Sequence, residues 1–600
     1  MSFTSNQENF NSANQQRMST NTDSSNGYEK CNMKQVFEKN QASDQNSALK
    51  KREQFAISLR KNKHQQVLQS KRRENMQSMF QRTQEVIKSG SSFQDFTSQD
   101  FIPINDEATL IQMIEFLNQA HSRFQENQLQ RLKVVRSIRL GITNERTSDH
   151  IIYYFEKNRN HMGTFLDIIK DGDVDLEIKS EAMWSLCTLA CENKLSNYIG
   201  TDLNILEHLK DLLHYHFIDN HQILGQIERQ NLLTSQEASL LEQTLWTISN
   251  IILDSAKIRV HALDIRIDYS IGVIIHSYGQ QFNDQIWRVV IWLLSGLSTG
   301  LAYMTSSHHD VFNQFLAVNL SRVYKMIMET YNKITNEKEK SNKIVQLKED
   351  IAVIVDCVSR DCEDAQIEVI AKMEHVRSLM MSFITDKNPR YFVHCAKYVG
   401  DISAVDETQA NFFINSGILE EFDVYMSFCS KTDKINIIWV LSNFAANSSR
   451  DAEKVAGSTI IHKLILLLND KNYDIRKESI WTICNICQSI EDDHVIDLVI
   501  NSGIVQSAID LFIHDKDSGL ILYLTMKALQ FLFTKSHRAK NIFINFGGVS
   551  MLVDMQICDY IEVYKIASEI IEQHFNGEEI DHQEALKMFQ EKESAVFKLD

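Results

Sequence analysis

The chain has 600 residues, of which 43% are hydrophobic and 24% charged, so it has the composition of an ordinary soluble protein and is too long for one compact core. Its formal net charge of −17 disfavours nucleic acid as the main partner and favours basic partners. Only two prolines and 19 glycines interrupt the chain, which favours helices throughout.

The ten cysteines lie mostly inside apolar helical patterns, and no secretory signal pattern opens the chain. These features predict a reducing compartment, the cytosol or the nucleus. The sequence contains no uncharged apolar run of about 18 residues, so we expect no transmembrane helix.

The N-terminal segments differ in composition. Residues 1–45 are rich in Ser, Asn, Gln and Thr, which predicts disorder. Residues 46–80 are basic and helix-prone, and residues 81–105 have the composition of a polar linker. Residues 50–73 carry nine Lys or Arg and one acidic residue, so a basic segment precedes an acidic body. This asymmetry suggests that the two parts contact each other.

From residue 106 the chain becomes a series of apolar helical segments with a recurring pair, a Trp followed four residues later by an Asn. The complete copies are Trp246 with Asn250, Trp439 with Asn443 and Trp481 with Asn485, and two looser copies pair Trp184 with Thr188 and Trp292 with Gly296. Residues four apart lie on one helix face, so the pairs predict a ladder of rings and amides that suits an extended peptide. For the two looser Trp residues core packing is an equally good interpretation, and we expect Trp287 to pack in the core.

The spacing of these residues indicates structural repeats. It is 46 residues from Trp246 to Trp292 and 42 from Trp439 to Trp481. Periods of about 40–47 residues are typical of armadillo and HEAT repeats, which contain two or three helices each. The wider gaps predict a long loop at residues 214–236 and an insertion at residues 331–350.

A glycine after a helix also recurs. Gly417, Gly503 and Gly548 each precede a new apolar helical segment, in phase with the Trp copies. Glycine permits the tight turn that joins two helices, so these positions support the repeat.

Three groups of residues together resemble the importin-α family, the adaptors that carry nuclear localisation signals to importin-β. The basic clusters Lys50-Lys51-Arg52, Leu59-Arg60-Lys61 and Lys71-Arg72-Arg73 are similar to that family's importin-β-binding segment. The second group is the Trp and Asn ladder. The third, which is similar to the family's last repeat, is Val563-Tyr-Lys565, Ile571-Glu572 and Phe575, followed by acidic residues. The resemblance covers nearly all of residues 46–576.

The resemblance implies an all-α fold, a right-handed superhelical solenoid of about ten armadillo repeats over residues 106–576. A flexible basic N-terminal segment would precede it, and an acidic tail at residues 577–600 would follow. The implied function is that of a nuclear import adaptor, which binds the signals of cargo proteins in a concave groove and is linked to importin-β. An export receptor would recycle it through the last repeat. Such an adaptor shuttles between cytoplasm and nucleus, and it needs no cofactor, metal, membrane insertion or direct nucleic-acid contact.

The family's binding residues map onto this sequence in three sets. The major signal-binding site would comprise Trp184, Gln243, Trp246, Asn250, Asp254 and Trp292. The minor site would comprise Lys397, Asp401, Trp439, Asn443, Glu478, Trp481 and Asn485. Importin-β binding, and autoinhibition when importin-β is absent, would use Lys50, Lys51, Arg52, Arg60, Lys61, Lys63, Lys71, Arg72 and Arg73. The major site departs from the family at Thr188, Gly296, Glu192 and Asn197, so we expect it to be weakened and the minor site to be better preserved. The charge of Asp401 is expected to attract a basic ligand.

Several plainer interpretations stay open. The missing clamp residues Thr188 and Gly296 also fit an armadillo scaffold or regulatory protein that has lost signal binding. The basic run at residues 50–73 could be a solvated helix or a localisation signal in its own right. Cys484 and Cys487 match a C-x-x-C pattern, but they lie in an apolar helix without a second pair, which disfavours zinc. No catalytic motif is recognisable, so we expect no enzymatic activity.

Overall fold

A computed structural model of the chain describes residues 102–119, 125–144, 147–219, 232–298, 306–361, 364–405, 407–556, 558 and 560–575. The predicted disordered segment, importin-β-binding segment and acidic tail, at residues 1–45, 46–80 and 577–600, lie outside this part, as does most of the predicted linker at 81–105. The chain divides between Glu74 and Asn75 into two units, and every described residue belongs to the second.

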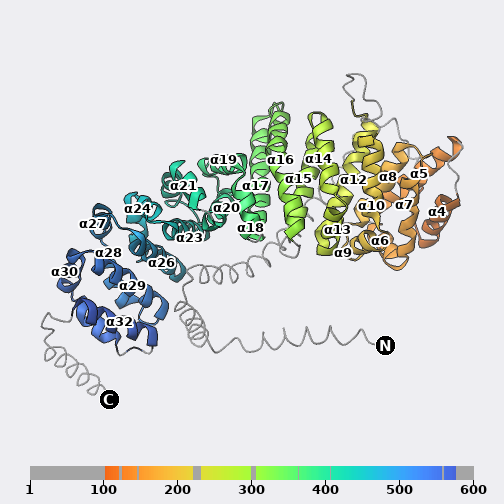
Figure 1. Cartoon of the computed structure of the whole chain (residues 1–600). Coiled ribbons are helices and arrows are strands. Elements are labelled where there is room, and N and C mark those ends of the chain that lie inside the picture. The colour runs from red at the N-terminus through yellow and green to blue at the C-terminus, as the bar shows by residue number, and fades with distance from the viewer. Residues whose placement is uncertain are drawn as a thin grey trace, which may run out of the picture. The chain divides into compact units, whose positions relative to one another are not determined.

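Ten helices of this unit form a row in chain order, in which each helix packs along the next (Figure 1). We call them the long-helix row: α5 (Gln125–Thr143), α8 (Leu176–Leu189), α12 (Ser235–Asp254), α15 (Asp284–Ser298), α17 (Glu337–Asp361), α20 (Phe392–Val405), α23 (Lys431–Asn447), α26 (Tyr473–Ser489), α29 (Gly519–Lys535) and α32 (Ile561–His574).

Mostly shorter helices precede the row or connect its members. In chain order they are α4 (Glu107–Gln119), α6 (Ser148–Lys157), η2 (Arg159–Met162), α7 (Gly163–Lys170), α9 (Asn193–Thr201), α10 (Ile205–Leu213), η3 (His214–Asp219), α13 (Ala256–Asp264), α14 (Ile267–Tyr278), η4 (Gly279–Gln281), α16 (Ser306–Tyr331), α18 (Asp364–Ala371), α19 (Glu374–Thr385), α21 (Glu407–Asn415), α22 (Ile418–Tyr425), α24 (Ser449–Gly457), α25 (Ile460–Leu467), α27 (Asp493–Asn501), α28 (Ile504–His514), α30 (His537–Asn545) and α31 (Gly548–Met555).

The repeat is clearest from α21 onwards, where two short helices precede each long one four times in succession. The short helices have 8 to 11 residues and the long ones 14 to 17. Three helices in a period of about 42 residues is the pattern of armadillo repeats. The predicted fold class is therefore confirmed: this is an all-α helical repeat protein that resembles armadillo repeats.

Left-handed glycines form the turns between the short helices. Gly417 (φ 85°) and Gly503 (φ 90°) precede α22 and α28, as the sequence predicted. In front of α31 the left-handed residue is Gly547 (φ 74°), not Gly548. Gly548 is small for a different reason, because a Cβ atom there would lie 2.5 Å from Cδ2 of Phe543.

The middle of the row departs from the three-helix pattern. Helix α16 is a single helix of 26 residues where most other repeats have two shorter helices, and α17 has 25 residues. Residues 331–350, where we predicted an insertion, form the end of α16, a short turn and the first half of α17. The additional residues therefore lengthen two packed helices instead of forming a loop. The predicted loop at 214–236 begins with the π-helix η3, and residues 220–231 lie outside the described part.

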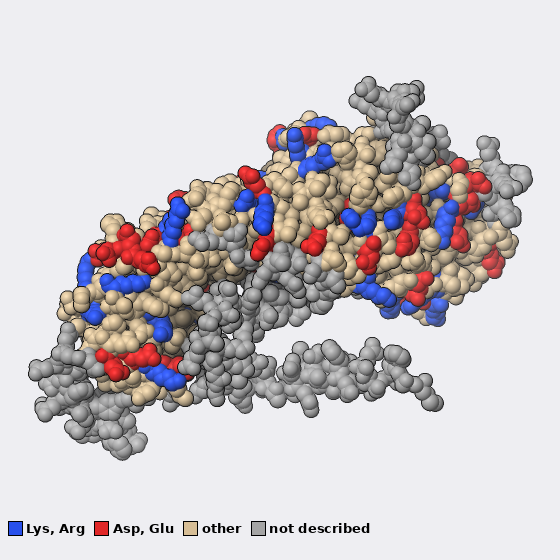
Figure 2. Space-filling view, in the orientation of Figure 1, with Lys and Arg blue, Asp and Glu red and all other residues tan. Residues whose placement is uncertain are grey.

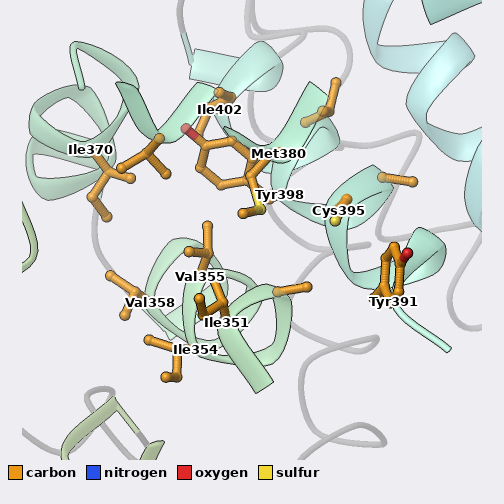
Figure 3. Packing of buried hydrophobic residues seen from close by; sticks show 14 of the residues in the cluster. Ile351, Ile354, Val355, Val358, Ile370, Met380, Tyr391, Cys395, Tyr398 and Ile402 are labelled. Carbon is orange, nitrogen blue, oxygen red and sulfur yellow. The ribbon is translucent and has the colours of Figure 1, made fainter. Parts of the chain in front are cut away.

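The core runs from repeat to repeat through side chains on facing sides of consecutive helices. Figure 3 shows this where α17 packs against α20: Ile351 and Val355 of α17 belong to one cluster with Met380 of α19 and Tyr398 of α20. All four side chains are buried. Trp287 is fully buried in α15, as predicted.

No single helix within the described ranges has the length and apolar composition to cross a membrane, although α27 and α28 meet that test together as a bent pair.

Candidate functional site

The ladder Trp residues lie on five members of the long-helix row, α8, α12, α15, α23 and α26. Trp439 and Trp481 are 42 residues apart, and Lys397 lies 42 residues before Trp439. The same spacing places Tyr523 one repeat after Trp481, on α29. Sequence analysis missed Tyr523, although this spacing would have identified it. The predicted minor-site residues thus lie on three adjacent helices, α20, α23 and α26.

The ladder asparagines connect neighbouring helices of the row. Asn443 Nδ2 donates a hydrogen bond to the Gly400 carbonyl of α20 (3.0 Å), and Asn485 Nδ2 donates to the Ser442 carbonyl of α23 (3.2 Å). Asn250 Nδ2 donates in the same way to the Cys187 carbonyl of α8 (3.1 Å). Each amide is therefore oriented by a backbone carbonyl one repeat earlier, which fixes which of its atoms is left for a ligand.

The three asparagines differ in how much donor capacity they retain. Asn485 Nδ2 also donates to Ser442 Oγ (3.0 Å), and Asn250 Nδ2 also lies within reach of two cysteine sulfurs, at 3.3 and 3.5 Å. Asn443 Nδ2 makes one hydrogen bond within the described part of the chain. An amide nitrogen carries two hydrogens, so Asn443 keeps one N–H as well as its oxygen. Asn443 therefore retains the most donor capacity, although it is only 3% exposed, whereas Asn485 is half-buried and is the most open of the three.

The five ladder tryptophans are not equally open. Trp246 and Trp292 are buried, each with 8% of its surface exposed, whereas Trp184, Trp439 and Trp481 are half-buried. Gln243, one turn before Trp246, is also buried. Asp254 is the last residue of α12, and its side chain lies outside the described part. The predicted major site thus lies on α8, α12 and α15 with two of its three rings largely covered.

The two departures from the Asn pattern have local structural explanations. Thr188 Oγ1 donates to the Trp184 carbonyl of its own helix (2.9 Å), so it does not tie α8 to its neighbour as an Asn would. A Cβ atom at Gly296 would lie 3.1 Å from Cδ1 of Ile252, so there is little room for a larger side chain between α15 and α12.

At the N-terminal end of the row, arginines of α5 reach the next helix. The Arg139 guanidinium lies 4.2 Å from the centre of the Trp184 ring, and Arg139 Nε also donates to Glu181 of α8. Arg136 Nε donates to the same carboxylate (2.8 Å) and its Nη2 to Glu177 (2.6 Å). Burial would raise the pKa of Glu181, but Arg139 and Arg136 outweigh it and lower that pKa. Sequence analysis missed this cluster, because α5 has no Trp that would show which of its residues face α8.

Charged side chains are also buried in the middle of the row. Asp401 is 3% exposed and accepts a hydrogen bond from Ser359 Oγ of α17 (2.9 Å). Asp356 accepts a hydrogen bond from His394 Nδ1 (2.6 Å), and Lys397 lies near enough to stabilise its charge. The charge that we expected Asp401 to present to a ligand is therefore mostly enclosed between α17 and α20.

The remaining predicted residues divide between the described and undescribed parts. Glu478 is buried one turn before the half-buried Trp481 on α26. All predicted importin-β-binding residues, from Lys50 to Arg73, lie outside the described part.

Metal ligation finds no support at the C-x-x-C pattern. Burial raises the pKa of Cys484 to about 12 and that of Cys487 still further, which disfavours the thiolate that a metal needs. Within the described ranges no group of three His, Cys, Asp or Glu residues is arranged to hold a metal ion.

Surface charge is mixed on the face shown in Figure 2, where Lys and Arg lie among Asp and Glu over most of the described helices. Over the described helices this face shows no continuous basic patch.

Comparison with known proteins identifies the fold and no family. No family model matches the chain, and no curated protein matches it. An engineered protein solved by the Northeast Structural Genomics Consortium superposes with a TM-score of 0.57 at 13% identity, covering 77% of this chain and 97% of its own. This likeness shows the fold alone.

Two shorter designed structures also match. A designed armadillo repeat protein in complex with the peptide (KR)4 has 18% identity, covers 41% of this chain and 97% of its own, and has a TM-score of 0.34. A structure of computationally designed armadillo repeat proteins for modular peptide recognition has 14% identity, covers 42% of this chain and 97% of its own, and has a TM-score of 0.34.

Proposed function

We propose that this protein is a nuclear import adaptor, which binds basic localisation signals of cargo proteins along the long-helix row. The observation that carries the proposal is the alignment of Trp439 with Asn443 on α23 and Trp481 with Asn485 on α26, at equivalent positions of adjacent helices. Half-buried indoles beside oriented amides suit an extended peptide with basic side chains.

Each part of this site has a chemical role in the proposal. The Asn443 amide holds the peptide backbone through its remaining N–H and its oxygen. The indoles of Trp439 and Trp481 accept the stems and charges of Lys or Arg, each of which gains about 0.5–2 kcal/mol from cation–π contact. The Glu478 carboxylate, which is 8% exposed and one turn before Trp481 on α26, adds a negative charge to the site. The activity that we propose is binding and transport, without catalysis or a cofactor.

The remaining partners rest on the resemblance. We propose that residues 46–80 bind importin-β, and that the cluster from Lys71 to Arg73 competes for the ladder when importin-β is absent. We also propose that an export receptor contacts the last repeat, formed by α30, α31 and α32. The protein would then shuttle between cytoplasm and nucleus.

The test is a titration of the full-length chain with a labelled peptide that contains two basic clusters. In the control peptide, Gln replaces the residues of both clusters. Asn443→Ala should weaken binding about tenfold or more. Asn447→Ala is a matched control, because Asn447 Nδ2 also donates to a carbonyl of α20, that of Ser403 (2.6 Å), but lies one turn further along α23. It should leave affinity unchanged. Replacing Lys71, Arg72 and Arg73 by Ala should tighten binding if the N-terminal segment competes.

Transport itself requires a separate assay. Addition of the protein and importin-β to permeabilised cells should bring labelled cargo into nuclei, and the Asn443→Ala variant should not. Binding of basic peptides without import would keep the recognition part of the proposal and refute the adaptor part.

The alternative is an armadillo scaffold or regulatory protein without signal binding. The N-terminal half of the row favours it, since Trp246 and Trp292 are buried and Thr188 and Gly296 replace ladder amides. Under this alternative the two-cluster peptide would not bind at any salt concentration, and Asn443→Ala would change stability only.

A further inference from the structure

The first indole of the long-helix row has an arginine of the same chain on its face. The Arg139 guanidinium, from α5, lies 4.2 Å from the centre of the Trp184 ring on α8. This distance is well inside the range of about 6 Å over which a cation is attracted to an aromatic face. Trp184 therefore already has a bound cation, supplied one repeat earlier in the chain.

The same arginine also satisfies the carboxylate beside the ring. Arg139 Nε donates to Glu181, which lies one turn before Trp184 on the same helix. The Arg139 and Glu181 side chains are both nearly buried, at 8% and 11% exposure. Arg136 pairs with the other oxygen of the Glu181 carboxylate (2.8 Å). The negative charge of this site is thus neutralised within the protein.

A second pair on the row has the same spacing. Glu478 and Trp481 on α26 are three residues apart, as Glu181 and Trp184 are on α8. The helix before Trp481 carries Trp439 one repeat earlier in the sequence, whereas the helix before Trp184 carries Arg139 there. The chemistry of the two sites is alike, and their difference lies in what the preceding helix provides.

We propose that Arg139 is a built-in occupant of the first indole–carboxylate site of the row, so that a basic peptide is excluded from Trp184 and confined to sites further along the chain. This inference rests on the proposed recognition of basic peptides. It assigns Arg139 the role of a specificity-determining residue, because it sets where along the row a ligand begins and therefore how many basic positions of that ligand are recognised.

The experiment uses the full-length protein and a labelled octapeptide of alternating Lys and Arg. Arg139→Ala should bind this peptide about five- to tenfold more tightly than wild type, since the ring face and part of the Glu181 charge become available. Adding Trp184→Ala should abolish the gain. Arg159→Ala is the matched control, because it removes an arginine that lies 5.9 Å from the Tyr198 ring, away from the long-helix row. It should leave affinity unchanged.

A second measurement compares hydrogen exchange with and without the octapeptide. In the wild-type protein the octapeptide should slow hydrogen exchange in α23 and α26 and leave α8 unchanged. In Arg139→Ala, and in Arg139→Gln, which retains a donor for Glu181, protection should extend to α8. Protection of α8 in wild type, or no gain of affinity in folded Arg139→Ala, would overturn the inference.

The outcomes separate this inference from the proposed function. If wild type binds through Asn443 and Arg139→Ala gains nothing, the function stands and the inference is wrong. If wild type does not bind but Arg139→Ala binds through Trp184, Arg139 blocks the site as inferred and the proposed recognition at the later sites is wrong.

Discussion

The ring of Trp439 lies directly against Gly400 of the preceding long helix: a Cβ atom at position 400 would lie 2.7 Å from Cη2 of the indole. The Gly400 carbonyl also accepts the hydrogen bond of Asn443 (3.0 Å). One residue of α20 therefore positions both the indole and the amide that α23 contributes to the candidate site.

Replacement of Gly400 by Ala should displace the Trp439 ring. We expect a loss of about 1–3 kcal/mol in the free energy of unfolding, as for an overpacked core, together with weaker binding of the two-cluster peptide. Thermal unfolding and peptide titration check both effects. Gly457→Ala is the control, since a Cβ atom there meets nothing within 4 Å. Unchanged peptide affinity in Gly400→Ala would show that the position of the Trp439 ring does not matter for binding.

The left-handed turns should be sensitive to any side chain. Gly417→Ala and Gly503→Ala place a Cβ atom at φ angles of 85° and 90°, which costs about 1–2 kcal/mol each. The cost arises from backbone conformation, because a Cβ atom at Gly503 has no neighbour within 4 Å and one at Gly417 meets only the end of Glu420. Urea unfolding measures the effect, and Gly417→Asn should be less harmful than Gly417→Ala. Equal stability of Gly417→Ala and Gly417→Asn would refute the conformational explanation.

Lys535 should be needed at the C-terminal end of α26. Its Nζ donates to the carbonyls of Cys487 (2.9 Å), Gln488 (2.8 Å) and Ile490 (2.6 Å), which α26 itself leaves without a helical partner. Lys535→Met keeps the apolar stem and removes the donor, so we expect a loss of about 1–3 kcal/mol and faster hydrogen exchange at the end of α26. The exposed Lys516 provides the control, Lys516→Met, in which neither quantity should change.

Asp356 should contribute stability that depends on pH. Burial would raise its pKa, but Lys397, His394 and Arg360 hold that pKa well below its usual value of 3.8. A carboxylate whose pKa is lower in the folded state stabilises the fold above its unfolded pKa and loses this effect as the pH falls toward the folded pKa. Asp356→Asn should therefore be less stable than wild type by about 1–3 kcal/mol at pH 7, and the gap should narrow below about pH 4.

Urea unfolding between pH 3 and pH 7 measures this gap. Asp474→Asn, which removes a carboxylate that is 56% exposed, should show little difference from wild type at any pH. A gap for Asp356→Asn that stayed constant or widened in acid would contradict the assignment.

Local sequence patterns predicted the helical repeat well, because apolar periodicity, scarce prolines and the 42-residue spacing are properties of single segments. They predicted the turn at Gly417 for the same reason. They did not reveal that Asn204 (φ 47°) and Arg266 (φ 61°) adopt the left-handed conformation before α10 and α14. Asn favours that conformation but is common elsewhere, and Arg does not favour it.

The site was harder to predict than the fold, because exposure depends on the neighbouring helix. Trp246 and Trp439 begin the same motif, yet the structure buries Trp246 and leaves Trp439 half-buried. The position of Arg139 on Trp184 depends on the register between α5 and α8, which no motif in α5 indicates.

The strongest packing in the long-helix row joins consecutive helices, and this has a consequence for how the molecule unfolds. When most of the stabilising free energy lies in the interfaces between neighbouring repeats, the repeats can unfold one after another. The row can then unfold first at its end, at α32, while α23 and α26 remain folded. A peptide that contacted α23 and α26 together would raise the cost of opening the interface between them and leave the end free to fray. Denaturation would then occur in stages, and only the stage that includes these two helices would shift with ligand concentration.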